Sequence, residues 1–339
     1  MKAWVIEKGS SNLSGISLKE VESPKPLPHE VLIQNEVSGL NFADVMASKG
    51  LYRDAPPLPF VPGYDVVGKI VALGNKTENL QMGDRVCAFT RFSGCAEYSV
   101  AAYQGVVVID KDWDASEAVA LSTQYCTALY AAKYLGNIRS GERVLIHSAA
   151  GGVGRALVQY AKYAGCEIIA TAGSHAKCEQ VKNDGAHIVI NYNENDFSSE
   201  IISSLGKKSM DVVFDAVGGE NAKKGIQLLG PGGRFVGYGA SSLSQGVHFF
   251  NRIPKLLSFG FYHPGQLMMS SISICGVNML HIADKKPNLL KQVFDDVMEL
   301  RREGVLVPGI GTTFSYSDYL TALHKLANRE TSGKVCIRW

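Results

Sequence analysis

The sequence predicts an α/β protein in which a doubly wound parallel sheet accompanies a compact, mostly antiparallel barrel-like module. Two observations indicate the sheet: short apolar runs alternate with helical patterns, and a glycine-rich turn joins one run to a helix. Short alternating runs broken by Gly and Pro before residue 121 indicate the barrel. A chain of 339 residues is long enough for two separate cores of this kind.

The barrel is expected from alternating runs at 31–37, 66–73, 85–89 and 105–109. Residues 51–63 contain four prolines, so we expect a rigid loop there, either a connector or the wall of a cleft.

The sheet is expected from five buried runs and a sixth at 271–277; the five lie at 143–147, 167–171, 188–191, 212–215 and 234–237. Amphipathic helices at 288–303 and about 317–327 precede a strand at 334–338, and we expect this tail to rejoin the barrel. The predicted domains are 1–121, then 122–266 for the nucleotide, then 267–339, which includes the sixth strand region.

The glycine-rich turn predicts a dinucleotide site, although an ordinary strand-to-helix turn has the same composition. Gly151 leaves bare backbone for a pyrophosphate, Gly154 allows close packing of helix on strand, and the helix N-terminus attracts phosphates. The residues expected to contact the cofactor here are Ala150, Gly151, Gly152, Val153 and Gly154.

The end of the second strand favours NADPH over NADH. NAD sites normally place a carboxylate there for the ribose 2′-hydroxyl. Here the run 167–171 continues into Gly173 and Ser174, with Lys177 close behind and no acid. A small polar loop with a nearby cation is typical of a site that binds a 2′-phosphate. Taken alone, Lys177 is also typical of a solvent-exposed helix residue.

The composition is that of an ordinary soluble enzyme: 46% of residues are hydrophobic, 19% are charged and the net charge is +2. We expect no nucleic-acid partner and no integral membrane contact, because basic residues form no block and no apolar run reaches about 20 residues. Seven dispersed cysteines fit reduced thiols, and the chain is expected in the cytoplasm.

Four segments in order, 39–44, 62–68, 83–86 and 149–154, resemble the medium-chain dehydrogenase/reductase superfamily and its zinc-independent quinone oxidoreductases. Within that family the chain is most similar to the vesicle amine transport protein-like subgroup. The resemblance implies a GroES-like barrel domain, a Rossmann domain and a homodimer. Residues 272–277 are the candidate edge strand for that dimer, or else an interior strand.

The chain departs from the zinc-dependent relatives at their metal ligands. Asn41 stands where they have a cysteine, Tyr64 and Asp65 stand where they have His-Glu, and only Cys95 remains of their four-cysteine lobe. Amide and phenol groups do not replace thiolate and imidazole as zinc ligands, so both zinc sites are expected to be absent.

The resemblance also implies the site residues. Asn41 would contact the cofactor or a substrate oxygen, Tyr52 would bond substrate or ribose, and Asp44 would act in catalysis or hold a loop. Tyr64 would fill the former metal position. The further cofactor contacts that it implies are Thr127, Ser174, Lys177, Tyr192 and Arg329, with Gly239 and Gly276 either leaving room for the ribose and nicotinamide or making turns.

The expected activity is NADPH-dependent reduction of quinones or enones, which accept hydride without a metal. Two alternatives stay open. One is an NADPH-binding protein of low turnover that acts through a membrane, RNA or protein partner. The other is an enoyl-thioester reductase.

Overall fold

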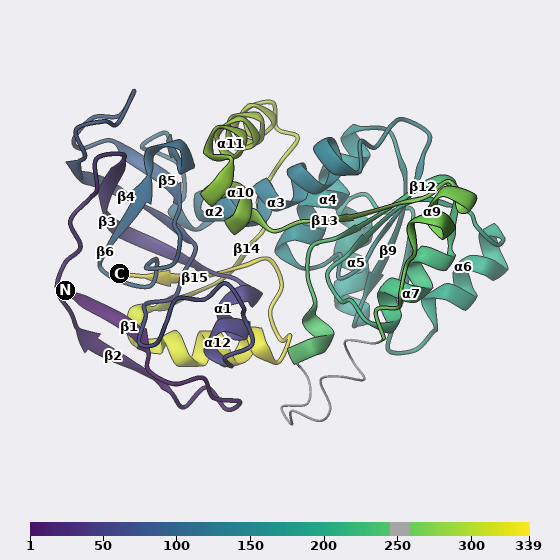
Figure 1. Cartoon of the computed structure of the whole chain (residues 1–339), viewed down its shortest axis with the longest axis horizontal. Coiled ribbons are helices and arrows are strands. Elements are labelled where there is room, and N and C mark those ends of the chain that lie inside the picture. Colours follow the sequence, from purple (N-terminus) through teal and green to yellow (C-terminus); the bar gives the residue numbers. More distant parts are fainter. Residues whose placement is uncertain (245–257) are drawn as a thin grey trace. The chain divides into compact units, whose positions relative to one another are not determined.

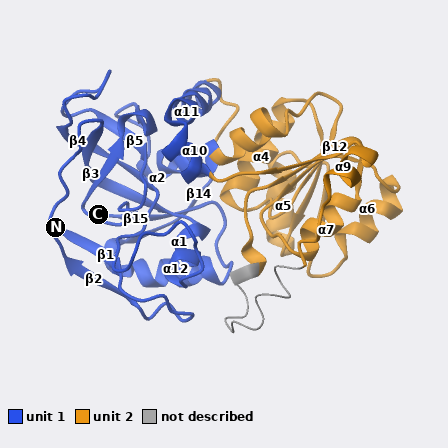
Figure 2. Ribbon diagram, viewed as in Figure 1, with its two compact units in different colours: residues 1–126, 279–302, 308–339 blue, residues 127–278, 303–307 orange. Residues whose placement is uncertain are grey.

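The computed structural model describes residues 1–244 and 258–339, which form two compact units (Figure 2). Unit 1 comprises Met1–Cys126, Met279–Arg302 and Pro308–Trp339. Unit 2 comprises Thr127–Asn278 and Glu303–Val307. The predicted boundaries stood at residues 121 and 266, whereas the main changes of unit fall after residues 126 and 278.

Unit 1 is built on a mostly antiparallel sheet of seven strands in the order β14-β15-β3-β4-β5-β7, with β6 also paired to β3. Two further strands, β1 and β2, form a ribbon. The bounds are β1 Lys2–Ile6, β2 Ile16–Glu20, β3 Glu30–Leu40, β4 Asp65–Leu73, β5 Arg85–Phe89, β6 Tyr98–Ala102, β7 Val106–Val108, β14 Ile310–Ser315 and β15 Lys334–Arg338.

The tail of the chain returns to unit 1, because β15 pairs antiparallel with β3 and parallel with β14. Alternate apolar residues of β3, β4 and β5, among them Val31, Ile33 and Val66, are fully buried in one core. The alternation of apolar and polar residues along these strands is the pattern from which the barrel was predicted.

The helices of unit 1 are α1 Phe42–Ser48, α2 Ala115–Ala120, α10 Met279–Lys285, α11 Pro287–Arg302 and α12 Tyr319–Ala327, with single turns at Tyr103–Gly105 and Tyr316–Asp318. A second core lies under α1 and α12, where Trp4 stacks on Tyr319 with the ring centroids 4.9 Å apart.

Unit 2 contains a six-stranded, wholly parallel sheet in the order β10-β9-β8-β11-β12-β13 (Figure 1). The strand bounds are β8 Arg143–Ile146, β9 Glu167–Ala172, β10 Ile188–Asn191, β11 Met210–Asp215, β12 Leu229–Gly237 and β13 Ser273–Gly276. The chain winds outward on both sides of the β8 and β11 pair, so the predicted doubly wound α/β fold is confirmed. Because β13 continues this sheet beside β12, unit 2 extends beyond residue 266.

The helices of unit 2 are α4 Gly152–Tyr163, α5 His175–Asp184, α6 Phe197–Leu205, α7 Glu220–Gln227 and α9 Pro264–Ser270, with a turn at Ser241–Ser244. The chain passes from unit 1 through π-helical turns at Leu121–Tyr125 and Tyr130–Leu135, around α3 Cys126–Leu129. Every residue from Val144 to Ile146 is fully buried, as expected for a parallel strand covered on both faces. None of the described helices combines the length and the apolar composition that a bilayer crossing requires.

Candidate functional site

The predicted dinucleotide turn lies between β8 and α4. Gly151 is the residue before the helix, and a Cβ on Gly154 would lie 2.4 Å from the Ser148 carbonyl oxygen and 2.6 Å from the Ala149 Cα. Gly154 therefore has to be glycine for α4 to approach the end of β8. The N–H groups of the first turn of α4 have no acceptor within the helix, so this turn can bind an anion.

Four of the predicted cofactor residues meet at the carboxyl end of β9. A Cβ on Gly173 would lie 2.4 Å from the Tyr192 hydroxyl oxygen, so the tyrosine side chain crosses the glycine. The Ser174 hydroxyl caps α5 by accepting from the Lys177 N–H at 3.4 Å. No carboxylate stands between Ala172 and Lys177, which agrees with the reason for expecting a 2′-phosphate.

Two residues at this edge were missed by the sequence reasoning. The Asn193 side chain donates to the Gly173 carbonyl at 2.7 Å, and the Glu194 carboxylate accepts from the Asn191 amide at 2.6 Å. Asn193 and Glu194 both follow the carboxyl end of β10. In a parallel sheet the residues after the strands lie together at this edge, so their position directly after a predicted strand was the signal that could have identified them.

The remaining cofactor predictions fall in several places. Thr127 is a buried residue at the start of unit 2. A Cβ on Gly239 would lie 2.7 Å from the Ala216 carbonyl oxygen, whereas Gly276, at the end of β13, has open space around it. Arg329 belongs to unit 1 and follows α12 with a left-handed φ of 61°. For these residues a cofactor contact stays a prediction.

Unit 1 holds a buried polar network around Asn41. Its Nδ2 donates to Asp65 Oδ2 at 2.6 Å, and its Oδ1 accepts from Lys334 Nζ at 2.9 Å. Lys334 and Asp65 also form an ion pair in which both side chains are fully buried. Buried charges of opposite sign satisfy one another here, which makes their burial tolerable.

The second Asp65 oxygen is also saturated. It accepts from the Ser122 hydroxyl at 2.8 Å, from the Thr123 N–H at 3.1 Å and from the Thr123 hydroxyl. The sequence reasoning placed Asp65 only as the counterpart of a zinc-family glutamate and Lys334 only in a strand. A lysine beginning the apolar run 335–337 was the signal that could have identified it.

Asp44 lies at the start of α1, fully buried. Its carboxylate accepts from the Asn41 N–H at 2.8 Å and from the Gly63 N–H at 2.9 Å, and so ties the helix to the turn before β4. Burial raises the pKa of Asp44 to about 7, although both hydrogen bonds oppose the shift. The contacts are those of a carboxylate that holds a loop.

Tyr52 and Tyr64, the two tyrosines predicted at the catalytic site, belong to an aromatic cluster. Tyr64 is buried, with its ring 4.9 Å from that of Phe92 and 6.1 Å from that of Tyr52. Its hydroxyl has no hydrogen-bond partner among the described residues. Tyr52 is half-buried, and burial raises the pKa of its phenol to about 12, so at neutral pH it is a donor.

The residues at the zinc family's ligand positions do not fit a zinc ion. Asn41 and Tyr64 are poor ligands, and the Asp65 carboxylate is already bonded to an ammonium. Across residues 1–244 and 258–339, no group of three His, Cys, Asp or Glu side chains is placed to hold a metal.

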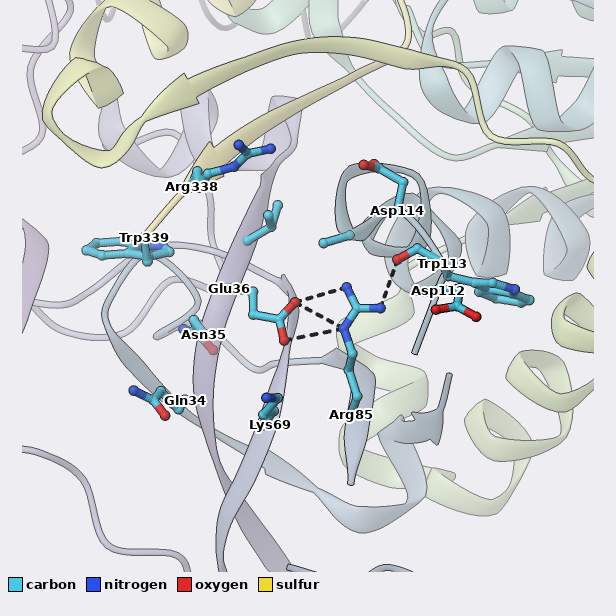
Figure 3. A pocket seen from close by; sticks show the side chains of 12 residues that line it. Gln34, Asn35, Glu36, Lys69, Arg85, Asp112, Trp113, Asp114, Arg338 and Trp339 are labelled. Carbon is cyan, nitrogen blue, oxygen red and sulfur yellow. Dashed lines mark hydrogen bonds and ion pairs between the residues drawn. The ribbon is translucent and has the colours of Figure 1, made fainter. Parts of the chain in front are cut away.

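A groove of about 680 Å³ on unit 1 is a separate feature, lined by none of the predicted site residues. Figure 3 shows Arg85 at its centre, bonded to Glu36 at 2.9 Å and to the Trp113 carbonyl at 2.8 Å. Its central charges therefore neutralise each other.

Both halves of the chain match known domain families. Residues 27–129 match the alcohol dehydrogenase GroES-like domain, and residues 152–295 match a zinc-binding dehydrogenase domain. The chain is 30% identical over 319 residues to the human synaptic vesicle membrane protein VAT-1 homolog, covering 93% of this chain and 80% of that one. The Danio rerio counterpart is also 30% identical, over 310 residues, covering 91% of this chain but only 64% of its own length.

Solved structures of similar proteins cover all or nearly all of the chain. A quinone oxidoreductase of Pseudomonas syringae has a TM-score of 0.86 at 26% identity, covering 100% of this chain and 99% of that one. A Thermus thermophilus quinone oxidoreductase, also solved as its complex with NADPH, has a TM-score of 0.80 at 26% sequence identity, covering 100% of each chain. The CurK enoyl reductase has a TM-score of 0.85 at 28% sequence identity, covering 99% of each chain.

Proposed function

The chain belongs to the medium-chain dehydrogenase/reductase superfamily, in its zinc-independent quinone oxidoreductase and VAT-1-like branch, and from this we propose that it catalyses the NADPH-dependent reduction of quinones or other activated carbonyl compounds such as enones. The observation that carries the proposal is the buried network of Asn41, Asp65 and Lys334: Asn41 and Asp65 stand at ligand positions of the zinc relatives, and the ammonium of Lys334 occupies the Asp65 carboxylate that could otherwise bind a metal.

Unit 2 would hold the cofactor. The first turn of α4 would bind the pyrophosphate, and Ser174, Lys177 and Tyr192 would surround the 2′-phosphate and adenine. NADPH supplies a hydride when bound. A Thermus thermophilus relative solved with NADPH supports this choice.

Residues of unit 1 would hold the acceptor. An asparagine amide has two N–H donors, and Asp65 accepts one of them, so Asn41 keeps one donor for a carbonyl oxygen that gains negative charge. The Tyr52 phenol is a second donor. Quinones and enones need no more than such donors, whereas alcohol oxidation needs an alkoxide stabilised by a metal or a base.

The test is a steady-state assay of NADPH oxidation with a quinone, an enone and a primary alcohol. We expect turnover with a quinone or enone, no reaction with the alcohol, and no loss of rate in the presence of a chelator. Asn41→Ala and Tyr52→Phe should lower quinone turnover while NADPH affinity stays within a few-fold. Robust alcohol oxidation, or full quinone activity in both variants, would contradict the proposal.

Two alternatives have support in the comparisons. The likeness to the CurK enoyl reductase favours an enoyl thioester as acceptor, which the same assay tests with that substrate. The likeness to vesicle membrane proteins favours a low-turnover protein that acts through a partner. The latter predicts NADPH binding with negligible oxidation by every acceptor.

We also propose that the protein is a homodimer in the cytoplasm. β13 pairs only with β12 among the described strands, and in the segment that precedes it along the chain Phe261, Met268 and Met269 are 83%, 77% and 86% exposed. An open edge preceded by exposed apolar side chains fits pairing with a second copy. Light scattering should give twice 36.6 kDa, and Met268→Lys should shift the mass to the monomer.

Free thiols at all seven cysteines agree with a reducing compartment.

A further inference from the structure

Lys334 is a lysine with no exposed side-chain surface, a rare state that requires partners for its charge. Its ammonium donates to Asn41 Oδ1 at 2.9 Å and to Asp65 Oδ2. These contacts bring the first residue of β15 to the end of β3 and the start of β4.

The network fixes which way the Asn41 carboxamide points. Its oxygen faces the ammonium, and its nitrogen faces the Asp65 carboxylate at 2.6 Å. A flipped amide would place N–H groups against the cation and the oxygen against the anion, and both contacts would be repulsive. The remaining capacity of the amide nitrogen is one N–H donor.

The fold makes room for this lysine at Gly39. A Cβ there would lie 2.3 Å from Lys334 Cε and 2.8 Å from Nζ. Gly39 has no positive φ that would demand glycine, so what a Cβ would meet there is the ion pair itself: the Lys334 side chain and, at 3.0 Å, Asp65 Oδ2. Three separate segments are thus shaped around one ammonium.

We propose that Lys334 is a positioning residue, whose ammonium locks the Asn41 amide so that an N–H, and not the carbonyl oxygen, is presented to the oxygen of the substrate. The inference rests on the proposed carbonyl reduction. It adds that the acceptor must offer a hydrogen-bond-accepting oxygen at Asn41, and that Lys334 acts only through Asn41.

A double-mutant cycle on Lys334→Met and Asn41→Leu tests this. Each single variant should lower kcat/KM for the quinone by on the order of tenfold to a hundredfold, mainly in kcat, with the dissociation constant for NADPH unchanged. The double variant should be no slower than Asn41→Leu alone, because the lysine has lost the group through which it acts. The inference would be overturned if the fold reduction in kcat/KM of the double variant equalled the product of the two single reductions, or if Lys334→Met had normal turnover.

Two further variants guard against a purely structural effect. Gly39→Ala keeps every charge but displaces the ammonium, so it should reproduce the kinetic defect of Lys334→Met. Arg85→Met breaks the Arg85 to Glu36 ion pair, also in unit 1, and should lower the melting temperature without changing kcat. If Lys334→Met does not fold, Lys334→Met with Asp65→Asn leaves no unpaired charge and replaces it in the cycle.

A measurement without turnover separates this inference from the proposed function. In the NMR spectrum of 15N-labelled protein, the Asn41 side chain should show one proton held by a carboxylate, with slow exchange, and Lys334→Met should increase its exchange rate. Unchanged exchange would overturn the locking of the amide. Failure of the unmodified protein to reduce any acceptor would instead overturn the proposed function.

Discussion

Lys334 and Asp65 stand 269 positions apart in the sequence and form a fully buried ion pair in unit 1. The pair links the first residue of β4 to the first residue of β15 across the end of β3, which pairs with both strands and is where the tail of the chain joins the barrel. A buried pair is not a strong source of stability in itself, but loss of one partner strands the other charge.

Lys334→Met should therefore lower the free energy of unfolding by about 3–5 kcal/mol, since the Asp65 carboxylate is left buried beside an apolar side chain. Adding Asp65→Asn should restore part of the loss. Urea denaturation of the unmodified, single and double variants measures it. A double variant less stable than Lys334→Met would mean that the ion pair is not the source of the effect.

Gly154→Ala should destabilise unit 2 and weaken NADPH binding, because the new methyl group would lie 2.4 Å from the Ser148 carbonyl oxygen. Overpacking of this kind costs about 1–3 kcal/mol. Gly151→Ala is the matched variant: its φ is −76° and the nearest atom to its Cβ is at 3.2 Å. It should keep the stability and lose only NADPH affinity. Equal stability of both variants by thermal melting would contradict the close packing of α4.

NADPH should bind at least roughly tenfold more tightly than NADH, about 1.4 kcal/mol, through contacts to the 2′-phosphate. Lys177→Ala should weaken NADPH and leave NADH nearly unchanged. Lys182→Ala, at the other end of α5, should change neither. Fluorescence titration of both cofactors measures the affinities, and equal binding by the unmodified protein would rule out a 2′-phosphate site.

His147 should make the protein less stable in acid. It is fully buried at the end of β8, against the ring of Phe197, and burial lowers its pKa from 6.5 to about 3. Between pH 6.5 and pH 3 the His147 imidazole binds a proton in the unfolded chain but not in the folded chain. The contribution of His147 to the free energy of unfolding therefore decreases as the pH falls through this range, by up to about 1.4 kcal/mol per pH unit.

The comparison for this effect is His147→Leu, which cannot titrate. The free energy of unfolding of both proteins is measured by urea denaturation from pH 7 to pH 4. As the pH falls, the unmodified protein should lose stability steadily relative to the His147→Leu variant. Parallel curves would show that His147 takes up its proton in the folded state as readily as in the unfolded state.

The sequence predicted the features that depend on neighbouring residues. The apolar runs of unit 2, the missing acid after β9 and the glycine turn are local patterns, and the parallel sheet and the turn from β8 into α4 follow them. Asn41, Tyr52, Asp44 and Tyr64 were identified as a group by resemblance, and the structure places all four in unit 1. Their catalytic roles stay predictions.

The sequence by itself thus determined the fold class, the alternation of strands and helices and the place of the glycine turn, because periodicity and bare backbone act over a few residues. Only the tertiary structure decided that Asn41 is held by Asp65 and Lys334, that Asp44 ties α1 to Gly63, and that the Lys334 side chain passes where a Cβ of residue 39 would lie. These contacts join β3, β4 and β15 across long stretches of chain. A residue's partner at such a distance is set by how strands pair, and no local pattern carries that register.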